Sequence, residues 1–235
     1  YPKGGVGVIA EKLVKGLESY GGEIRYKSKV QKVLFDGNQA IGVELINGEK
    51  LYSRTVISNA TRWNTFGGAG ITEPLIDKKH LPLSEKKWLN RYKPSPSFLS
   101  LHLGVNKSVV QEGTHCHHLI LKDWQEMEKE QGVAFISIPT LLDSSLAPEE
   151  NHIIHAFTPS SINEWENLNS KDYIQKKKEA ADQLIAKIEQ IIPGLKDNIC
   201  HKEIGSPRSH RRFLGRHQGS YGPIPSIRLP GLLPM

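Results

Sequence analysis

The sequence predicts an α/β (α+β) fold, in which a small β-meander precedes a larger mixed sheet with covering helices. Two stretches with apolar residues at helical spacing lie near the start of the chain and in its last third. Between them lie seven runs rich in β-branched and apolar residues, several separated by dipeptides typical of tight turns. With 235 residues, the chain is long enough for one large domain or two ordinary ones.

The opening stretch YPKGGVGVIAEKL places Gly5, Gly7 and Ala10 at the spacing of the dinucleotide fingerprint G-x-G-x-x-G/A. That fingerprint needs a strand before the glycines and a carboxylate about 20 residues later, and the pattern here supplies neither. We therefore favour a glycine turn that feeds a helix over residues 6–19 and ends at Gly21, with direct phosphate binding as the alternative. The apolar face of this helix would consist of Val6, Ile9, Leu13 and Leu17.

Three strand candidates follow, at residues 29–37, 40–46 and 50–60, and predict a three-stranded meander. The dipeptides Asp36-Gly37 and Asn47-Gly48 favour type I′ hairpin turns between them. The chain is irregular over residues 62–95, which we interpret as a domain junction.

Four more strand candidates lie in the second half of the chain and predict a sheet: residues 97–105, 117–123, 133–139 and 152–158. A long helix is predicted to start with Ser170 as its N-cap and to stop at Pro193-Gly194. Its apolar face would consist of Leu184, Ile185, Ile188, Ile191 and Ile192.

The composition of the chain is compatible with several classes of partner. The net charge of +6 suits an anionic membrane surface, a nucleic acid or a phosphate-bearing cofactor. Since no apolar run approaches the roughly 18 residues of a membrane helix, we expect any membrane contact to be peripheral. Two cysteines, Cys116 and Cys200, form no disulfide framework and favour a reducing compartment.

Two local clusters could carry chemistry. The stretch HCHH at residues 115–118 resembles a metal site, but strand alternation separates its side chains onto two faces, so we expect no metal. The stretch at residues 207–222 interleaves arginines with aromatic residues, yet one short basic segment is weak support for nucleic-acid binding, which we do not expect. No nucleophile elbow, P-loop or H-E-x-x-H pattern is present in the sequence.

Neither end of the sequence is typical of a complete protein. It starts without a Met or a transit segment and ends in a proline-rich stretch, so we expect an internal piece of a longer chain.

Several stretches together resemble the plant carotenoid cis-trans isomerases (prolycopene isomerases), which belong with the bacterial-type phytoene desaturases and, more distantly, the flavin amine oxidases. They run from one end of the chain to the other: YPKGGVGVIAEKLVKGLESYGGEI, TVISNATRW, PSFLSLHLGV, CHHLIL, SIPTLLDSSLAPE, HAFTPSSINEWE, SHRRFLGR and QGSYGP. The chain departs from the family at Val8, where we expect Lys. The family's N-terminal fingerprint and its final flavin-binding segment have no counterpart here.

The resemblance implies part of a two-domain, FAD-binding flavoprotein. Residues 1–61 would belong to the FAD-binding domain, 62–205 to the substrate-binding domain, and 206–235 to a segment returning to the FAD domain. The implied cofactor contacts are Val30, whose backbone would lie beside the adenine, and Ser58, Asn59 and Ala60, which would end a strand returning to the cofactor. An ordinary core valine is the alternative for Val30.

The implied activity is isomerisation of poly-cis lycopene to all-trans lycopene with reduced FAD and no net redox change. No side chain is assigned a catalytic role.

The implied setting is the plastid (chloroplast), with an apolar polyene substrate, a peripheral membrane surface and no nucleic acid. Arg211, Arg212 and Tyr221 are candidates for lining the flavin or polyene channel. The alternative is that the two arginines form salt bridges on the surface and that the tyrosine packs against neighbouring side chains. Three alternatives stay open: a phytoene desaturase, an amine oxidase, or a non-catalytic remnant or binding module. Whichever applies, the isolated chain is expected not to hold FAD tightly, because the family's fingerprint and final flavin-binding segment have no counterpart in it.

Overall fold

The computed structural model describes residues 1–71, 73–89, 91, 93–121, 123–127 and 129–224. The chain forms two compact units: a first unit of Tyr1–Ile24 with Pro96–His210, and a second unit of Arg25–Ser95 with Arg211–Met235. These units do not coincide with the ranges 1–61, 62–205 and 206–235, whose assignment to cofactor and substrate domains stays a prediction. The end of the expected returning segment, from residue 225, lies outside the described residues.

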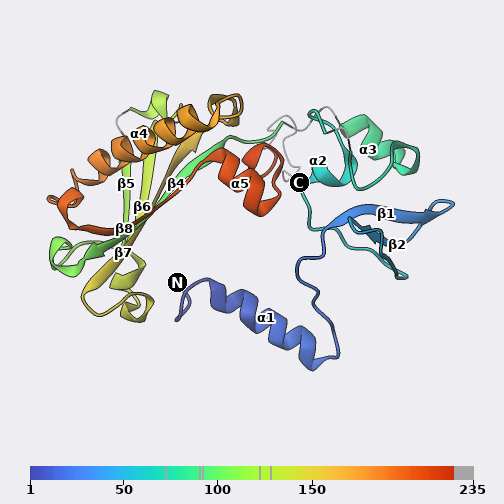
Figure 1. Cartoon of the computed structure of the whole chain (residues 1–235), viewed down its shortest axis with the longest axis horizontal. Helices are drawn as coiled ribbons and strands as arrows, with labels where there is room; N and C mark the ends of the chain where they lie inside the picture. Colours follow the sequence, from blue (N-terminus) through green and yellow to red (C-terminus); the bar gives the residue numbers. More distant parts are fainter. Residues whose placement is uncertain (72, 90, 92, 122, 128, 225–235) are drawn as a thin grey trace, which may run out of the picture. The chain divides into compact units, whose positions relative to one another are not determined.

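A large antiparallel sheet dominates the first unit (Figure 1). In the described residues it has five strands in the order β5-β6-β7-β4-β8. Their bounds are β4 (Ser97–Asn106), β5 (His117–Leu121), β6 (Val133–Ser137), β7 (Asn151–Ser160) and β8 (Ile199–Gly205). The four expected strands are confirmed, whereas the expectation of a mixed sheet is wrong, because each recorded pairing is antiparallel. The prediction missed β8 because its sequence, ICHKEIG, has few apolar residues.

Helix α4 (Ser170–Ile188) covers one face of this sheet (Figure 1). Alternate residues of β4 are fully or almost fully buried on that face, as the two-residue period of a strand requires. They pack in one core with the apolar face of α4, and the residues of that core include Leu99, Leu101, Leu103, Val105, Ala181, Leu184, Ile185 and Ile188. The helix begins one residue earlier than predicted, because the Asn169 side chain accepts a hydrogen bond from the Asp172 amide at 3.0 Å.

Helix α1 (Gly7–Ser19) confirms the glycine-turn prediction. Gly4 and Gly5 have φ of +84° and +87°, and the helix ends where Gly21 reaches φ +79° and the Gly22 amide donates to the Leu17 carbonyl. The expected apolar face is present, yet no residue of Gly7–Ser19 is buried. The exposed fractions of its apolar side chains are 62% for Val6, 51% for Ile9, 70% for Leu13 and 46% for Leu17.

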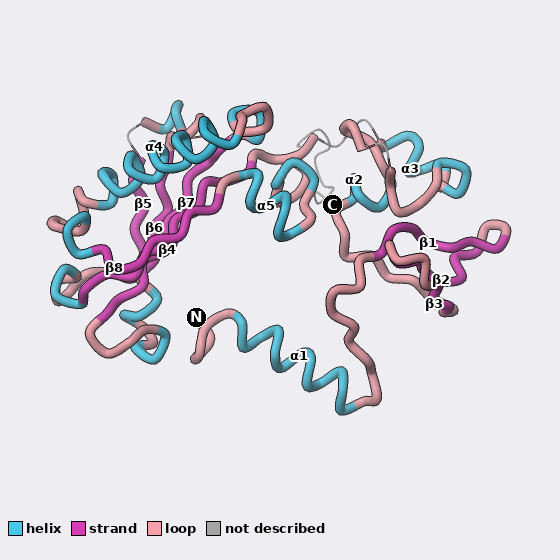
Figure 2. Tube along the Cα trace, in the orientation of Figure 1, coloured by secondary structure: helices cyan, strands magenta, loops and turns pink. Residues whose placement is uncertain are grey.

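The second unit contains the expected meander, β1 (Val30–Asp36), β2 (Gln39–Leu45) and β3 (Lys50–Tyr52), which is antiparallel throughout (Figure 2). Strand β3 is shorter than the predicted 50–60, because after Tyr52 the chain leaves the ladder with β2. The type I′ prediction is wrong for the first hairpin, whose central residues are Gly37 and Asn38, since of these two only Gly37 has a positive φ. The second hairpin has a longer loop, in which the Gly48 amide donates to the Leu45 carbonyl.

The expected junction at residues 62–95 is a folded part of the second unit. It contains α2 (Arg62–Phe66) and α3 (Leu83–Trp88), and the Val33 amide of β1 donates to the Leu75 carbonyl at 2.7 Å. Helix α5 (Pro207–Leu214) follows β8. Short 3₁₀ turns lie at Lys78–His80, Lys107–Val109, Trp124–Glu126, Pro139–Leu141, Ser144–Leu146, Ile162–Glu164, Lys196–Asn198 and His217–Gly219.

Candidate functional site

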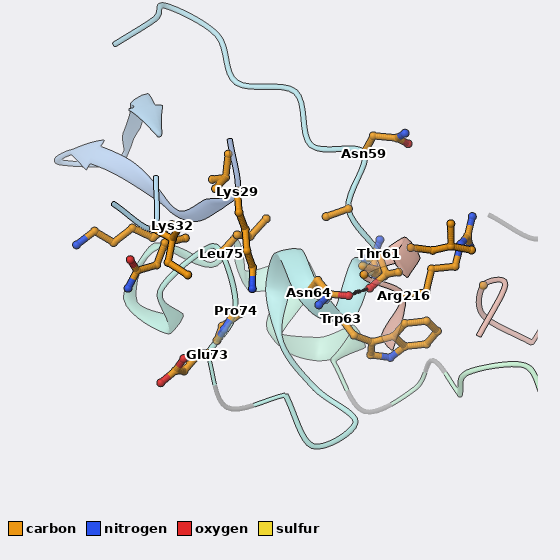
Figure 3. A pocket seen from close by; sticks show the side chains of 18 of the residues that line it. Lys29, Lys32, Asn59, Thr61, Trp63, Asn64, Glu73, Pro74, Leu75 and Arg216 are labelled. Atoms are coloured by element: carbon orange, nitrogen blue, oxygen red, sulfur yellow. Dashed lines mark hydrogen bonds between the residues drawn. The ribbon is translucent and has the colours of Figure 1, made fainter. Parts of the chain in front are cut away.

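A pocket of about 1100 Å³ lies in the second unit (Figure 3). Three of the four residues predicted to bind the cofactor, Val30, Asn59 and Ala60, line it together. The fourth, Ser58, is not among the lining residues, and its hydroxyl oxygen lies 2.9 Å from the Thr65 hydroxyl oxygen. The structure thus gathers most of the predicted set around one cavity.

Short-range hydrogen bonds around α2 hold the pocket walls in place. Thr61 caps this helix, its hydroxyl accepting from the Asn64 amide at 3.1 Å. The Asn64 carbonyl in turn accepts from the Leu75 amide at 2.8 Å, which ties the loop at residues 73–75 to the helix. Since Leu75 also accepts from β1, the loop, the helix and the strand form one wall.

The lining is richer in cations than in carboxylates. Lys29, Lys32, Arg62 and Arg216 line the pocket, and among the described lining residues Glu73 is the one carboxylate. Two of these cations are also ion-paired outside the pocket lining, since Lys32 lies 3.3 Å from Glu44 and Arg62 contacts Glu85. A cavity with this balance of charge favours an anionic ligand such as a phosphate group.

Trp63 is the large buried side chain of this wall. It is 2% exposed, and its ring centroid lies 5.5 Å from that of His217. In the described part of the chain, its indole nitrogen Nε1 is buried and has no hydrogen-bond acceptor. Trp63 therefore packs into the wall of the pocket, and its indole nitrogen presents almost no surface to a ligand.

The pocket also has apolar surface for a flat ring, supplied by Val30, Ile46, Leu75 and Tyr221. Together with the cations, this surface fits a nucleotide such as FAD. Of the channel candidates, Tyr221 lines the pocket. Arg211 and Arg212 do not appear in its described lining, and the Arg212 guanidinium lies 5.3 Å from the Phe213 ring centroid.

Trp63, Lys29 and Arg216 were missed by the sequence reasoning. Trp63 stands three residues after the predicted SNA stretch, in SNATRW, and Lys29 stands directly before Val30. Proximity to the predicted contacts was the available signal for these two. Arg216 comes from a distant segment, and no local pattern relates it to the others.

A second candidate surface is the face of the large sheet opposite α4. The pairing places His117, Ser137, His155, His102 and Glu203 in one row across the strands, here called the polar row. A second row on the same face lies two residues away from the polar row along β5, β6 and β7. It consists of Leu119, Phe135 and Phe157 and is here called the apolar row. Phe135 and Phe157 are stacked at 4.8 Å, and Phe98 meets Phe157 edge-on at 5.3 Å.

The polar row contains a pair of neighbouring imidazoles. The rings of His102 and His155 lie 4.7 Å apart, and burial, with repulsion from His102 adding to it, holds the pKa of His155 below its usual range. This ring is therefore neutral at neutral pH. On the α4 side of the sheet, burial likewise lowers the pKa of His152, whose Nδ1 lies 2.8 Å from the Thr140 hydroxyl.

The HCHH stretch contributes its side chains to separate contacts. His117 Nδ1 lies 3.1 Å from the Ser137 hydroxyl, His118 Nε2 lies 2.8 Å from the His115 carbonyl oxygen, and the Cys116 thiol donates to the Ile138 carbonyl. Among the residues that the structure describes, no group of three or more His, Cys, Asp or Glu is arranged to hold a metal ion.

Comparison with known proteins gives the relatives of this chain. It is 47% identical over 237 aligned residues to the chloroplastic prolycopene isomerases of Daucus carota and Arabidopsis thaliana, in alignments that cover 100% of the chain. The chain is related to the prolycopene isomerases over its whole length. It spans 38% of the carrot protein and 39% of the Arabidopsis protein. No family model matches it.

The chain also has more distant relatives among the phytoene desaturases. A lycopene-forming phytoene desaturase of Pantoea ananas is 25% identical over 229 residues, covering 94% of the chain and 45% of that protein. The fold resembles that of an oxidoreductase from Methanosarcina mazei, with a TM-score of 0.58 and 17% identity over 86% of this chain and 42% of that one. This structural likeness confirms the predicted α/β (α+β) class, apart from the mixed sheet corrected above.

Proposed function

We propose that this chain is part of an FAD-dependent carotenoid cis-trans isomerase that converts poly-cis lycopene to all-trans lycopene. The observation that carries the proposal is the 47% identity to the carrot and Arabidopsis prolycopene isomerases over the whole chain. The desaturase relative is only 25% identical, so the isomerase is the better match and the desaturase the second candidate.

The pocket of the second unit would hold the adenosine diphosphate half of FAD. Val30, Asn59 and Ala60 line it, and Ser58 supports the same wall through its contact with Thr65. The cations of the lining suit a pyrophosphate, and the apolar surface beside Val30 suits an adenine ring. An isolated nucleotide in a pocket this open to solvent is expected to bind weakly.

The chemistry explains why a flavoprotein could carry out a reaction with no net redox change. Rotation about a C=C bond is slow because it breaks a π bond, and a bound reduced flavin supplies reversible electron or proton donation that lowers the bond order of a conjugated polyene. The protein residues then bind and orient the substrate and exclude water.

The apolar row of the large sheet would seat the polyene. The ring faces of Phe135 and Phe157, with Leu119 at the edge, offer a flat apolar surface that spans about 10 Å across three strands. Phe157 and Leu119 are 38% and 50% exposed, so their surface is open to a ligand. His155, two residues from Phe157 on the same face of β7, would lie where this apolar surface ends and the polar row begins.

We further propose that the protein works in the plastid at a membrane surface, because its carotenoid substrate does not dissolve in water. No helix within the described residues is long and apolar enough to cross a membrane. Contact through exposed apolar side chains, aided by the net charge of +6, fits a peripheral mode of binding. Binding to anionic liposomes should then fall at high salt.

A chimeric enzyme tests the proposed function. The segment of the carrot prolycopene isomerase that aligns with this chain is replaced by these 235 residues, and the purified chimera is incubated in the dark with poly-cis lycopene and reduced FAD. Chromatography should show all-trans lycopene. A matched chimera with Phe157→Glu, which places a charge on the apolar row, should make far less product with unchanged folding.

The other outcomes separate the alternatives. Products with additional double bonds would move the assignment to a desaturase. A folded, FAD-loaded chimera that makes neither product would favour the non-catalytic remnant.

A further inference from the structure

We propose that the face of the large sheet opposite α4 binds isoprenoid alcohols, with the hydrocarbon chain on the apolar row and the hydroxyl group hydrogen-bonded to the imidazole of His155. The role of the apolar row as a seat for the chain is part of the proposed function, on which this assignment rests. It adds a polar group to the ligands that the sheet accepts, and it makes His155 the residue that selects them.

The middle of the polar row is open, whereas its ends are paired. At one end His117 Nδ1 lies 3.1 Å from the Ser137 hydroxyl oxygen, and at the other Glu203 lies 3.5 Å from His201 Nε2. Within the described residues, the ring nitrogens of His155 have no hydrogen-bond partner, and neither is fully buried. Both nitrogens therefore remain accessible to a ligand on this face.

The neighbours of His155 on the sheet hold its ring. The ring of His102, directly opposite on β4, meets it edge-on at 4.7 Å with an angle of 74° between the ring planes. On the other side, β6 places Ser137 opposite His155. Burial, with repulsion from His102 adding to it, lowers the pKa of His155, so the ring that meets the ligand is neutral at neutral pH.

A neutral imidazole fits a hydroxyl group. It presents one N–H donor and one nitrogen acceptor, and a hydroxyl can accept from the first or donate to the second. Neither the polar row nor the apolar row contains a Lys or an Arg that would attract a carboxylate or a phosphate. Glu203, the carboxylate of the polar row, disfavours an anion further. The ligand that matches these groups is an uncharged alcohol.

The apolar row begins beside His155. Phe157 lies two residues further along β7 on the same face, about 7 Å away at the rise of a strand. Phe135 stacks on Phe157 at 4.8 Å, and Leu119 continues the row on β5. A hydroxyl group at His155 thus places the first isoprene units of its chain over the two phenylalanine side chains, which suit an apolar chain with C=C bonds.

The test compares farnesol with β-farnesene, an isoprenoid hydrocarbon with the same number of carbon atoms, in NMR titrations of the 235-residue chain. The ring C–H signals of His155 and Phe157 report binding. Both signals should shift with farnesol, which should bind about five- to tenfold more tightly than β-farnesene, the gain expected for one hydrogen bond.

Variants assign this preference to the imidazole. His155→Phe keeps a ring but removes the donor and the acceptor, so it should bind the two ligands equally. His155→Gln keeps a donor and an acceptor and should retain most of the preference. The matched control, His115→Phe, changes an exposed histidine outside both rows and should leave the ratio of the two affinities unchanged. Phe157→Ala should weaken both ligands and preserve their ratio.

The outcomes separate the role of His155 from the proposed function. If both ligands bind at the apolar row with equal affinity, the seat stands and the role of His155 is overturned. A preference for farnesol that survives in His155→Phe also overturns it, because the hydroxyl group is then recognised elsewhere. If neither ligand moves the Phe157 signal up to its limit of solubility, the seat and the role of His155 both fall.

A folding defect in His155→Phe does not remove the test. The ratio in the unmodified chain and in His155→Gln then decides, and equal affinities for farnesol and β-farnesene in the unmodified chain overturn the assignment. Lycopene isomerisation by the chimera is measured independently of these titrations, so a failure of the proposed activity is recognised on its own.

Discussion

At the scale of single residues, Thr140 pairs with two polar groups of the first unit. Thr140 is 4% exposed, and its hydroxyl accepts from the Ile153 amide at 3.2 Å and lies 2.8 Å from His152 Nδ1. One side chain thus satisfies a strand amide and a buried imidazole together.

Thr140→Val should lower the free energy of unfolding by about 1–3 kcal/mol, because it leaves the Ile153 amide and the His152 ring without their partner. Urea unfolding followed by circular dichroism measures this. Thr55→Val, at an exposed position, should change stability by less than about 0.5 kcal/mol. Equal effects of the two substitutions would contradict the role given to Thr140.

Stability should fall as the pH drops below about 6.5, the ordinary pKa of histidine. Since the pKa of His155 is lowered in the folded chain, the unfolded chain takes up a proton first, and the loss grows until the pH passes the folded pKa. His152 acts in the same direction, with burial as the main cause and repulsion from Lys107 as the second.

The measurement is urea unfolding between pH 7.5 and 5.5, where carboxylates stay ionised in both states. His155→Gln should flatten the pH dependence. The unmodified chain, measured over the same pH range, is the control. An unchanged slope in His155→Gln would rule out His155 as a source of the effect.

At the scale of elements, α1 and α4 are both amphipathic, but only α4 has fully buried apolar side chains. Ala181, Leu184 and Ile188 of α4 are fully buried against the large sheet, whereas every residue of Gly7–Ser19 keeps some exposure. Helix α1 therefore depends on its own backbone bonds and its glycine cap.

Backbone amides of α1 should exchange with deuterium far faster than those of β4, which is paired on both sides. Exchange measured by NMR or mass spectrometry at neutral pH tests this. Gly21→Ala, which strains a φ of +79°, should speed the exchange of α1 and leave β4 unchanged. Similar protection of both elements would show that α1 is packed more firmly than its exposure indicates.

The elements were predictable to the extent that their patterns are local. Alternation along residues 97–105 and the apolar spacing of residues 184–192 report burial directly, so the central strand and the long helix were found. Strand β8 was missed because it is held by its pairing with β4 and carries little apolar signal. Asn59 and Ala60 line the same pocket as Val30, and their role in cofactor binding stays a prediction. Arg216 reaches that pocket only through the fold.

At the scale of the whole molecule, two compact units have separate sets of buried side chains. Leu101 belongs to the core under α4, while Trp63 and Leu45 are buried in the second unit. The chain crosses between the units after residues 24, 95 and 210, so each unit is assembled from separate segments.

Leu101→Ala should cost about 2–5 kcal/mol, the range for emptying a fully buried leucine site. Residue-resolved hydrogen exchange should show the loss in the first unit, with amides of β1 and β2 unaffected. Leu119→Ala, at a site that is 50% exposed, should cost less than about 1 kcal/mol. A matching loss of protection in β1 and β2 would mean that the two units unfold as one.

The order of strands in the large sheet also determines how long β4 lacks one of its neighbours during synthesis. Strand β4 lies between β7 and β8, and residue Ser100 pairs with Gly205, about a hundred positions later. At roughly 5–20 residues per second, the ribosome needs about 5–20 s to make that stretch. Until it is made, the strand that ends up inside the sheet is an edge, open to pairing with other chains.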